Sequence, residues 1–178
     1  MNTLSRLNSP QLHLVIASRP AVSALMNALI ARLALAGAVQ VLDAGNLFDV
    51  YRIARLAQRQ SPHLGTCLNN IHVARAFTYY QVAAQIEPIT ASGVPIMVLD
   101  LPATFCDETA SLGERLRLLE RCLERLYQTS RSVPVVVSAA LHKAKDAEPL
   151  MSKLQGRADH IWRFEAVAPP APAQLRLL

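Results

Sequence analysis

The 178-residue sequence contains no apolar run of the roughly 18 residues that a membrane-spanning helix needs. Its first ten residues also lack the charged start and the apolar stretch of a signal peptide. We therefore expect a soluble, cytoplasmic protein without a membrane partner. Hydrophobic residues make up 52% of the chain, which argues against disorder and suffices for one α/β domain with a sizeable core.

Cysteine is scarce, and the three copies, Cys67, Cys106 and Cys122, are scattered without the spacing of metal ligands. This pattern argues against a disulfide framework and a zinc site, and it favours buried thiols. The five histidines lie far apart, with none of the His-Cys or His-Glu spacings typical of metal sites or nucleophilic catalysis. The sequence therefore predicts no metal ion, and we assign no histidine a catalytic role.

Lysine is also scarce, since only three of the 18 basic residues are lysines. The formal net charge of +5 is compatible with an anionic partner but too small to indicate nucleic acid by itself. The candidate contacts to a DNA backbone are Arg52, Arg55 and Arg59, which share one face of a predicted helix, and Lys143 and Lys145 in one loop. A solvated helix face is the alternative for the arginines, and two acidic residues lie among the lysines.

Six short apolar runs alternate with helical patterns, which is typical of a mostly parallel sheet covered by helices on both faces. Several runs are continuously hydrophobic, as expected of strands buried on both sides. The runs are residues 12–17, 39–43, 71–77, 95–101, 134–139 and 160–164. We predict one α/β core domain over residues 1–165, followed by a Pro/Ala-rich tail over 166–178 that is extended or mobile.

Local signals mark the ends of the helices between these runs. Pro20 suits a first helical turn, and Gly37 is the residue type favoured just after a helix. A second helix is predicted over residues 47–60, with Asn46 as its cap and Asp49 placed to interact with the helix dipole.

A capping box indicates the start of the longest amphipathic helix, because Ser111 is followed three positions later by Glu114. Leucines then recur at helical spacing and predict one apolar stripe that packs into the core. The stripe consists of Leu112, Leu116, Leu119, Leu123 and Leu126.

The order of these features resembles the core ATPase domain of the RecA-type recombinases, most closely their archaeal and eukaryotic branch, from about Leu12 to Phe164. The segments that carry the resemblance are "VLDAGNLF" (41–48), "NNIHVARAFTYYQ" (69–81), "PIMVLDLPATF" (95–105), "VPVVVSAA" (133–140) and "LQGRADHIWRF" (154–164). The resemblance implies a three-layer RecA-like P-loop NTPase fold. With right-handed crossovers, it implies the strand order 71–77, 39–43, 95–101, 134–139, 12–17, 160–164.

The stretch that matches the family's phosphate-binding loop, "ASRPAVSA" (17–24), has lost that loop's chemistry. Ala17 and Val22 stand where the family has glycines, and a β-branched valine resists the backbone conformations of a phosphate-cradling turn. Ser23 replaces the phosphate-binding lysine, and Ala24 replaces the hydroxyl that would bind magnesium. We therefore interpret Arg19 and Ser23 as residues of a vestigial P-loop.

The other positions of the family's active site are altered as well. Asp100 matches the Walker B aspartate, but Leu101 replaces the serine beside it. No glutamate follows the second strand to activate water. Asp43 is not the equivalent of that glutamate, because the family's aspartate that matches Asp43 lies one or two positions before the glutamate. Ala140 replaces the glutamine that senses the γ-phosphate. The resemblance thus implies no ATP hydrolysis and no cofactor, and leaves Arg19, at a helix N-terminus, as a weak anion site.

The resemblance also bears on partners. Residues 141–153 match the place where recombinases carry a loop that grips single-stranded DNA, although no aromatic residue is present there to stack on bases. The family polymerises by passing an aromatic-x-x-Ala segment to a neighbour's edge strand, and residues 1–11 contain no such motif. We therefore do not expect a filament, while a symmetric homodimer stays an alternative.

The function we expect is that of a catalytically inactive RecA-like domain, acting as a binding or scaffolding module in DNA recombination or repair. Single-stranded DNA and a protein such as a recombinase are its candidate partners. Two alternatives are a protein inhibitor like SulA, a RecA-like cell-division inhibitor without a P-loop, and a residual nucleotide-binding protein that uses Asp100. A fold by itself does not decide between them.

Overall fold

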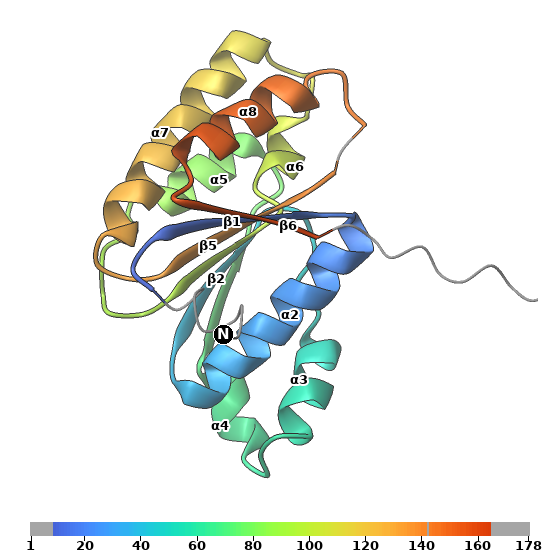
Figure 1. Ribbon diagram of the computed structural model, residues 1–178, viewed down its shortest axis with the longest axis vertical. Coiled ribbons are helices and arrows are strands. Elements are labelled where there is room, and N and C mark those ends of the chain that lie inside the picture. Colours follow the sequence, from blue (N-terminus) through green and yellow to red (C-terminus); the bar gives the residue numbers. More distant parts are fainter. Residues whose placement is uncertain (1–8, 142, 165–178) are drawn as a thin grey trace, which may run out of the picture.

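The computed structural model describes residues 9–141 and 143–164, and its centre is one six-stranded parallel sheet (Figure 1). The strands are β1 (Leu12–Ala17), β2 (Val39–Asp43), β3 (Ile71–Arg75), β4 (Ile96–Leu99), β5 (Val135–Ala140) and β6 (His160–Phe164). Their order is β3-β2-β4-β5-β1-β6, and every pairing is parallel. The predicted strands and their order are confirmed, although β3 and β4 are shorter than predicted.

Helices cover both faces of this sheet (Figure 1). One layer contains α2 (Arg19–Ala36), α3 (Val50–Gln58) and α4 (Leu64–Asn69), and the other contains α5 (Tyr79–Ile86), α6 (Pro102–Phe105), α7 (Leu112–Ser130) and α8 (Ala147–Arg157). Alternate residues of β1 serve different layers, because Leu14 packs with α5 to α8 whereas Val15 packs with α2 to α4. The sheet therefore separates two hydrophobic cores.

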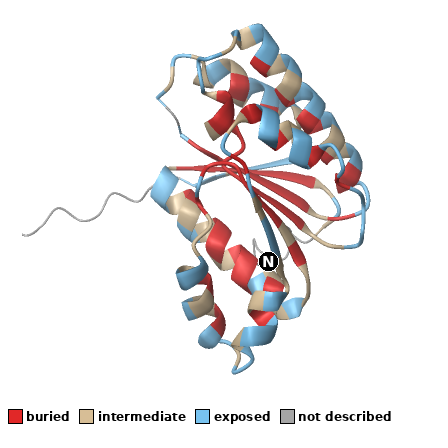
Figure 2. Ribbon diagram, turned by 180° about the vertical axis from the view of Figure 1, so that it is seen from behind, coloured by how far each residue is buried: buried red, intermediate tan, exposed pale blue. Residues whose placement is uncertain are grey.

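Burial differs sharply between the middle and the edges of the sheet. Every residue of β1, β4 and β5 is buried, as the red strands of Figure 2 show. The edge strands β3 and β6 contain no fully buried residue. The outer edges of β3 and β6 pair with no other strand in the described part of the chain.

The first helix, α2, begins at Arg19 with Pro20 in its first turn and ends at Ala36, where the amide of Gly37 donates to the Leu33 carbonyl. Among the described residues, α2 is the one helix long and apolar enough to cross a membrane by length and composition. Its buried residues pack in the core on one face of the sheet. Because a core helix meets the same criterion, this composition alone is no argument for a membrane.

The predicted start of α3 is wrong. The helix begins at Val50, and its cap is Asp49, whose carboxylate accepts the amide of Arg52 at 3.0 Å. Asn46 lies outside the helix with a positive φ of 54°. The reason is a long-range contact: the side chain of Asp43 accepts the amides of residues 47 and 48 at 2.8 and 3.2 Å, which holds this segment as a turn.

The start of α7 agrees with the prediction, because the Ser111 hydroxyl accepts the Glu114 amide at 3.2 Å. The carboxylate of Glu114 bonds instead to the hydroxyl of Tyr80 on α5. In the leucine stripe, the members from position 119 onward are buried, and the two nearer the start are half-buried. Burial is complete for Cys67 and Cys122 but only partial for Cys106. The predicted tail over 166–178 lies outside the described residues.

Candidate functional site

In a parallel sheet the carboxyl ends of all strands lie at one edge, where α/β proteins place their ligands. Asp100 follows β4 at this edge and is fully buried, with an exposed fraction of 0%. One of its carboxylate oxygens accepts the amide of Ala140, at the end of β5, at 2.8 Å. The other forms an ion pair of 3.2 Å with the guanidinium of Arg19, at the start of α2. One carboxylate thus joins the ends of β4 and β5 and the start of α2.

Gly45 makes this arrangement sterically feasible. A Cβ atom at Gly45 would lie 2.3 Å from the Cβ of Asp100 and 2.8 Å from its Oδ2. The carbonyl of Gly45 accepts a second bond from Arg19, 2.6 Å from Nη2. Asp100 itself adopts a positive φ of 51°, an uncommon backbone conformation that its surroundings must stabilise. The guanidinium of Arg19 therefore bonds to both Gly45 and Asp100.

This geometry decides what the site can do chemically. The sequence suggested that Arg19 attracts an external anion, but its anion is the chain's own Asp100. Magnesium is held by oxygen ligands, and a carboxylate that already bonds to an amide and a guanidinium has fewer lone pairs left for it. Here both carboxylate oxygens of Asp100 are engaged, one by an amide and one by a guanidinium. The site is an internal ion pair at the carboxyl edge of the sheet.

Ser23 does not belong to this cluster. It lies within α2, where its carbonyl and hydroxyl accept bonds from the side-chain amide of Asn27 at 2.7 and 3.4 Å. The buried Asn27 also donates to the Leu47 carbonyl at 2.8 Å and accepts the Asp49 amide at 2.9 Å. Sequence analysis missed this role of Asn27, whose one signal is a polar residue among the mostly apolar residues of α2.

Asp43, at the end of β2, has a structural role. Besides the turn amides, its carboxylate accepts Nε of Arg75 at 3.1 Å and pairs with its Nη2 at 3.0 Å. Asp43 is fully buried, so it holds the ends of β2 and β3 together.

The candidate DNA contacts lie at the surface in two separate groups. Arg55 and Arg59 are exposed and Arg52 is half-buried, and none of their side chains forms an ion pair with another described residue. Lys143 and Lys145 are exposed in the segment before α8. In Figure 1, α3 lies in the layer of α2, whereas this segment leads into the opposite layer. Their joint contact with DNA stays a prediction.

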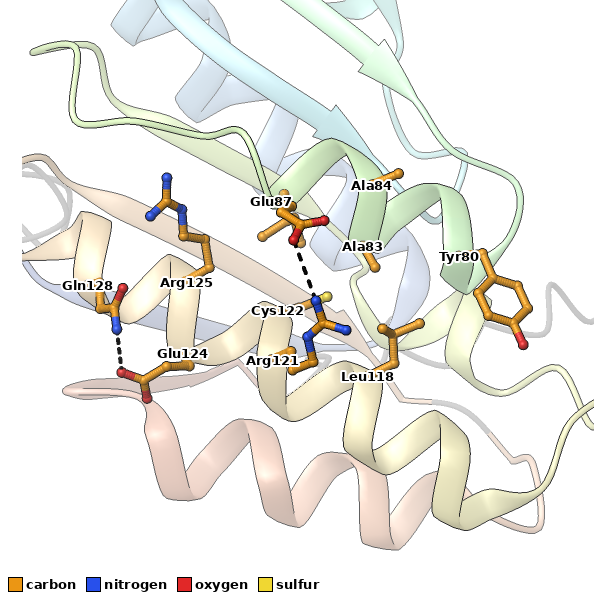
Figure 3. Close-up of a pocket in the computed structure, with 11 residues that line it drawn as sticks. Tyr80, Ala83, Ala84, Glu87, Leu118, Arg121, Cys122, Glu124, Arg125 and Gln128 are labelled. Carbon is orange, nitrogen blue, oxygen red and sulfur yellow. Dashed lines mark hydrogen bonds and ion pairs between the residues drawn. The ribbon is translucent and has the colours of Figure 1, made fainter.

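Two hollows flank α5. The larger, of about 540 Å³, lies between α5 and α7 (Figure 3). In it Glu87 pairs with Arg121 at 3.4 Å, and Gln128 donates to Glu124 at 2.9 Å. Arg125 lines the same groove, and its buried Nε has no hydrogen-bond partner among the described residues.

Two titratable groups line this larger groove as well. Burial raises the pKa of the Cys122 thiol to about 12, which keeps it protonated and unreactive. The hydrogen bond to Glu114 raises the pKa of the Tyr80 hydroxyl above its usual value. Neither group is therefore suited to nucleophilic or acid–base chemistry near neutral pH.

The second hollow, of about 460 Å³, lies at the outer edge of the sheet. It is lined by β2, β3 and the side of α5 that faces away from the larger groove. Its apolar lining residues in the α5 layer of the core are Leu42, Ala74, Ile89 and Ile96.

A scan of models of known protein families finds no match to the chain, and a search of curated proteins finds none either. Functional inference therefore rests on these sites and on the fold.

Proposed function

We propose that this protein is a RecA-like domain without ATPase activity that acts as a binding module in DNA recombination or repair. Its partner in this proposal is a protein, such as a recombinase, that contributes an extended segment to the open edge of β3. The observation that carries the proposal is this edge together with the hollow beside it.

The closed cluster around Asp100 supports the non-catalytic part of the proposal. A P-loop NTPase needs free backbone amides, a lysine and an accessible carboxylate to hold magnesium and phosphates. Here the carboxylate is buried, and Arg19 covers it together with Gly45. The segment that resembles the phosphate-binding loop already belongs largely to α2.

The backbone of β3 supports the binding part. The amide of Ala76 donates to Asp43, and the amide of Val39 donates to Asn70. Because backbone groups of successive strand residues point to opposite sides, the amides of Ile71, Val73 and Arg75 face away from β2. An added strand would bond to them, which is the recognition mode known as β-augmentation.

The hollow beside β3 would supply the side-chain specificity of this contact. An extended segment laid along β3 projects alternate side chains toward the α5 layer, where the apolar lining includes Ala74 and Ile89. Recombinases of the family that the sequence resembles pass an aromatic-x-x-Ala segment to such an edge. A segment of that kind fits a hollow of about 460 Å³.

The test is the binding of a fluorescent aromatic-x-x-Ala peptide from a recombinase to the full chain, measured by anisotropy. Val73→Pro removes an outward amide while the bonds to β2 stay, because proline is tolerated on an edge strand whose amide faces outward. We expect it to weaken binding about tenfold or more, corresponding to roughly 1.4 kcal/mol. Val73→Thr keeps the amide and is the matched control.

Equal binding by Val73→Pro and wild type would rule out strand addition at β3. Thermal unfolding of both variants shows whether the fold is retained. A peptide whose aromatic residue is replaced by alanine should bind more weakly if the hollow takes that ring. Absence of binding by the unaltered peptide would contradict the recombinase assignment.

A further inference from the structure

A third hollow, of about 280 Å³, lies at the carboxyl ends of β2 and β3. Its walls come from three segments, residues 44–46 after β2, residues 75–77 at the end of β3, and α6 with the residue Asp107 that follows it. It is separate from the hollow at the open edge of β3 and shares no residue with it. A ligand of this third hollow would therefore bind independently of the partner proposed for β3.

One residue that lines the hollow carries a buried polar atom without a partner among the described residues. Thr104 on α6 is only 7% exposed, and its hydroxyl oxygen forms no hydrogen bond with another described residue. Proteins rarely leave a buried hydroxyl unpaired, because such a group has lost its water and gained nothing. Since Thr104 lines the hollow, a bound molecule could supply the missing hydrogen bond.

Another lining residue, Phe77, offers a flat apolar surface. Phe77 lines the hollow and is 73% exposed, although most large apolar side chains of the protein are buried. Its backbone is held in place, because its amide donates to the side chain of Gln81 at 2.8 Å. An exposed phenylalanine on a fixed backbone is suited to stacking against a planar ring.

The rim carries one group of each charge. One oxygen of Asp107 accepts the Thr109 amide at 3.1 Å, and the other has no bond within the described residues. Arg75 directs Nε and Nη2 to Asp43, so Nη1 is left over, and its side chain is 40% exposed. The hollow thus offers an acceptor for an amino group and a cation for a phosphate.

We propose that this hollow binds a nucleobase. The base stacks on Phe77, its edge bonds to the Thr104 hydroxyl, and Asp107 accepts a hydrogen bond from its exocyclic amino group. Arg75 contacts the attached phosphate. Because thymine and uracil have no exocyclic amino group, the hollow favours adenine, cytosine and guanine. The base belongs either to a free nucleotide or to a single strand, and both share this chemistry.

The test uses the full chain at low salt with labelled short homo-oligonucleotides of adenine, cytosine or thymine and an abasic strand of equal length. We expect the adenine and cytosine strands to bind about tenfold more tightly than the thymine strand, since their amino groups bond to a charged acceptor. Phe77→Ala should weaken binding by about five- to 150-fold, the usual loss for one stacked base. Tyr51→Ala is the matched control, because Tyr51 is 80% exposed but does not line the hollow.

Thr104→Val separates a ligand contact from a structural role. Valine keeps the shape and removes a hydroxyl that bonds to nothing in the described chain, so the melting temperature should stay unchanged or rise. Affinity should nevertheless fall about threefold or more, in keeping with the loss of one hydrogen bond. A lowered melting temperature with unchanged affinity would show that the hydroxyl serves the fold, and would contradict the proposal.

The remaining outcomes distinguish the source of the base. Adenosine monophosphate that competes as effectively as the strand identifies a free nucleotide as the ligand, and weaker competition identifies a single strand. Abasic strands that bind as tightly as the others would show that the protein contacts only the phosphate backbone of the strand, and would overturn the proposal. So would the absence of binding by every oligonucleotide and mononucleotide, or unchanged affinity in Phe77→Ala.

Discussion

Replacement of Gly45 by alanine tests the closed cluster around Asp100 directly. The new methyl carbon would lie 2.3 Å from the Cβ of Asp100, well inside van der Waals contact, and Asp100 is fully buried. Overpacking of this kind costs about 1–3 kcal/mol. If Asp100 moves away, it also weakens its hydrogen bond with the Ala140 amide and its ion pair with Arg19.

The second contribution follows from those bonds. A hydrogen bond to a charged group contributes about 1.5–3 kcal/mol, but Arg19 is half exposed, so we count only the buried amide bond in full. Gly45→Ala should therefore lower the free energy of unfolding by about 2.5–6 kcal/mol, measured by urea denaturation. Gly156→Ala is the control, because a Cβ atom there meets nothing within 4 Å.

A double substitution separates the steric clash from a general intolerance of side chains at position 45. Asp100→Gly removes the Cβ atom that an alanine at position 45 would meet, and glycine accepts the positive φ at that position. Gly45→Ala should then cost less in the Asp100→Gly background than in the wild type, a non-additivity expected only of residues in contact. Additive effects, or a Gly45→Ala protein as stable as wild type, would refute the reasoning.

The same cluster and the buried histidine give two more predictions. Because Arg19 covers the carboxylate of Asp100, that cluster should bind Mg·ATP no more tightly than about 1 mM. The measurement is isothermal calorimetry of Phe77→Ala, in which the third hollow has lost its stacking ring, and micromolar binding by this variant would contradict the prediction. Burial lowers the pKa of His13 below 6.5. The stacked neighbour His160 lowers this pKa further, whereas the negative charge of Asp159 raises it. The unfolded chain therefore binds the extra proton first, so stability should fall as pH drops below about 6.5 and level off below the folded-state pKa. His13→Gln should flatten this part of the pH profile of the free energy of unfolding. A profile as steep as that of wild type would show that another group causes the pH dependence.

The sheet was predictable because its strands are continuous apolar runs and its helices show clear periodicity and caps. The order of the strands followed from the resemblance to a known topology. The start of α3 was not predictable from local pattern, since Asn46 satisfies the preferences of a cap. The carboxylate of Asp43 instead takes the amides that a helix starting there would use. The short helix α4 buries a single residue, Cys67, and so leaves no periodic signal.

The residues of the candidate site were predictable from the sequence, but the contacts between them were not. Arg19 and Asp100 were singled out separately, one as an anion site and one as a former metal ligand. Their ion pair joins positions that are 81 residues apart, and no local pattern reports such a contact. The same holds for the unpaired hydroxyl of Thr104, because only the packed structure shows whether a threonine has a partner.

The position of β1 inside the sheet constrains when the chain can fold. β1 pairs with β5 on one side and β6 on the other, so Leu12 meets Val135 and His13 meets His160. Contacts of such large sequence separation slow folding, because a long loop must close before they form. During synthesis β1, which is fully buried in the folded sheet, has no neighbouring strand until β5 and β6 have left the ribosome. Until then the nascent chain exposes a largely hydrophobic segment that is prone to aggregate.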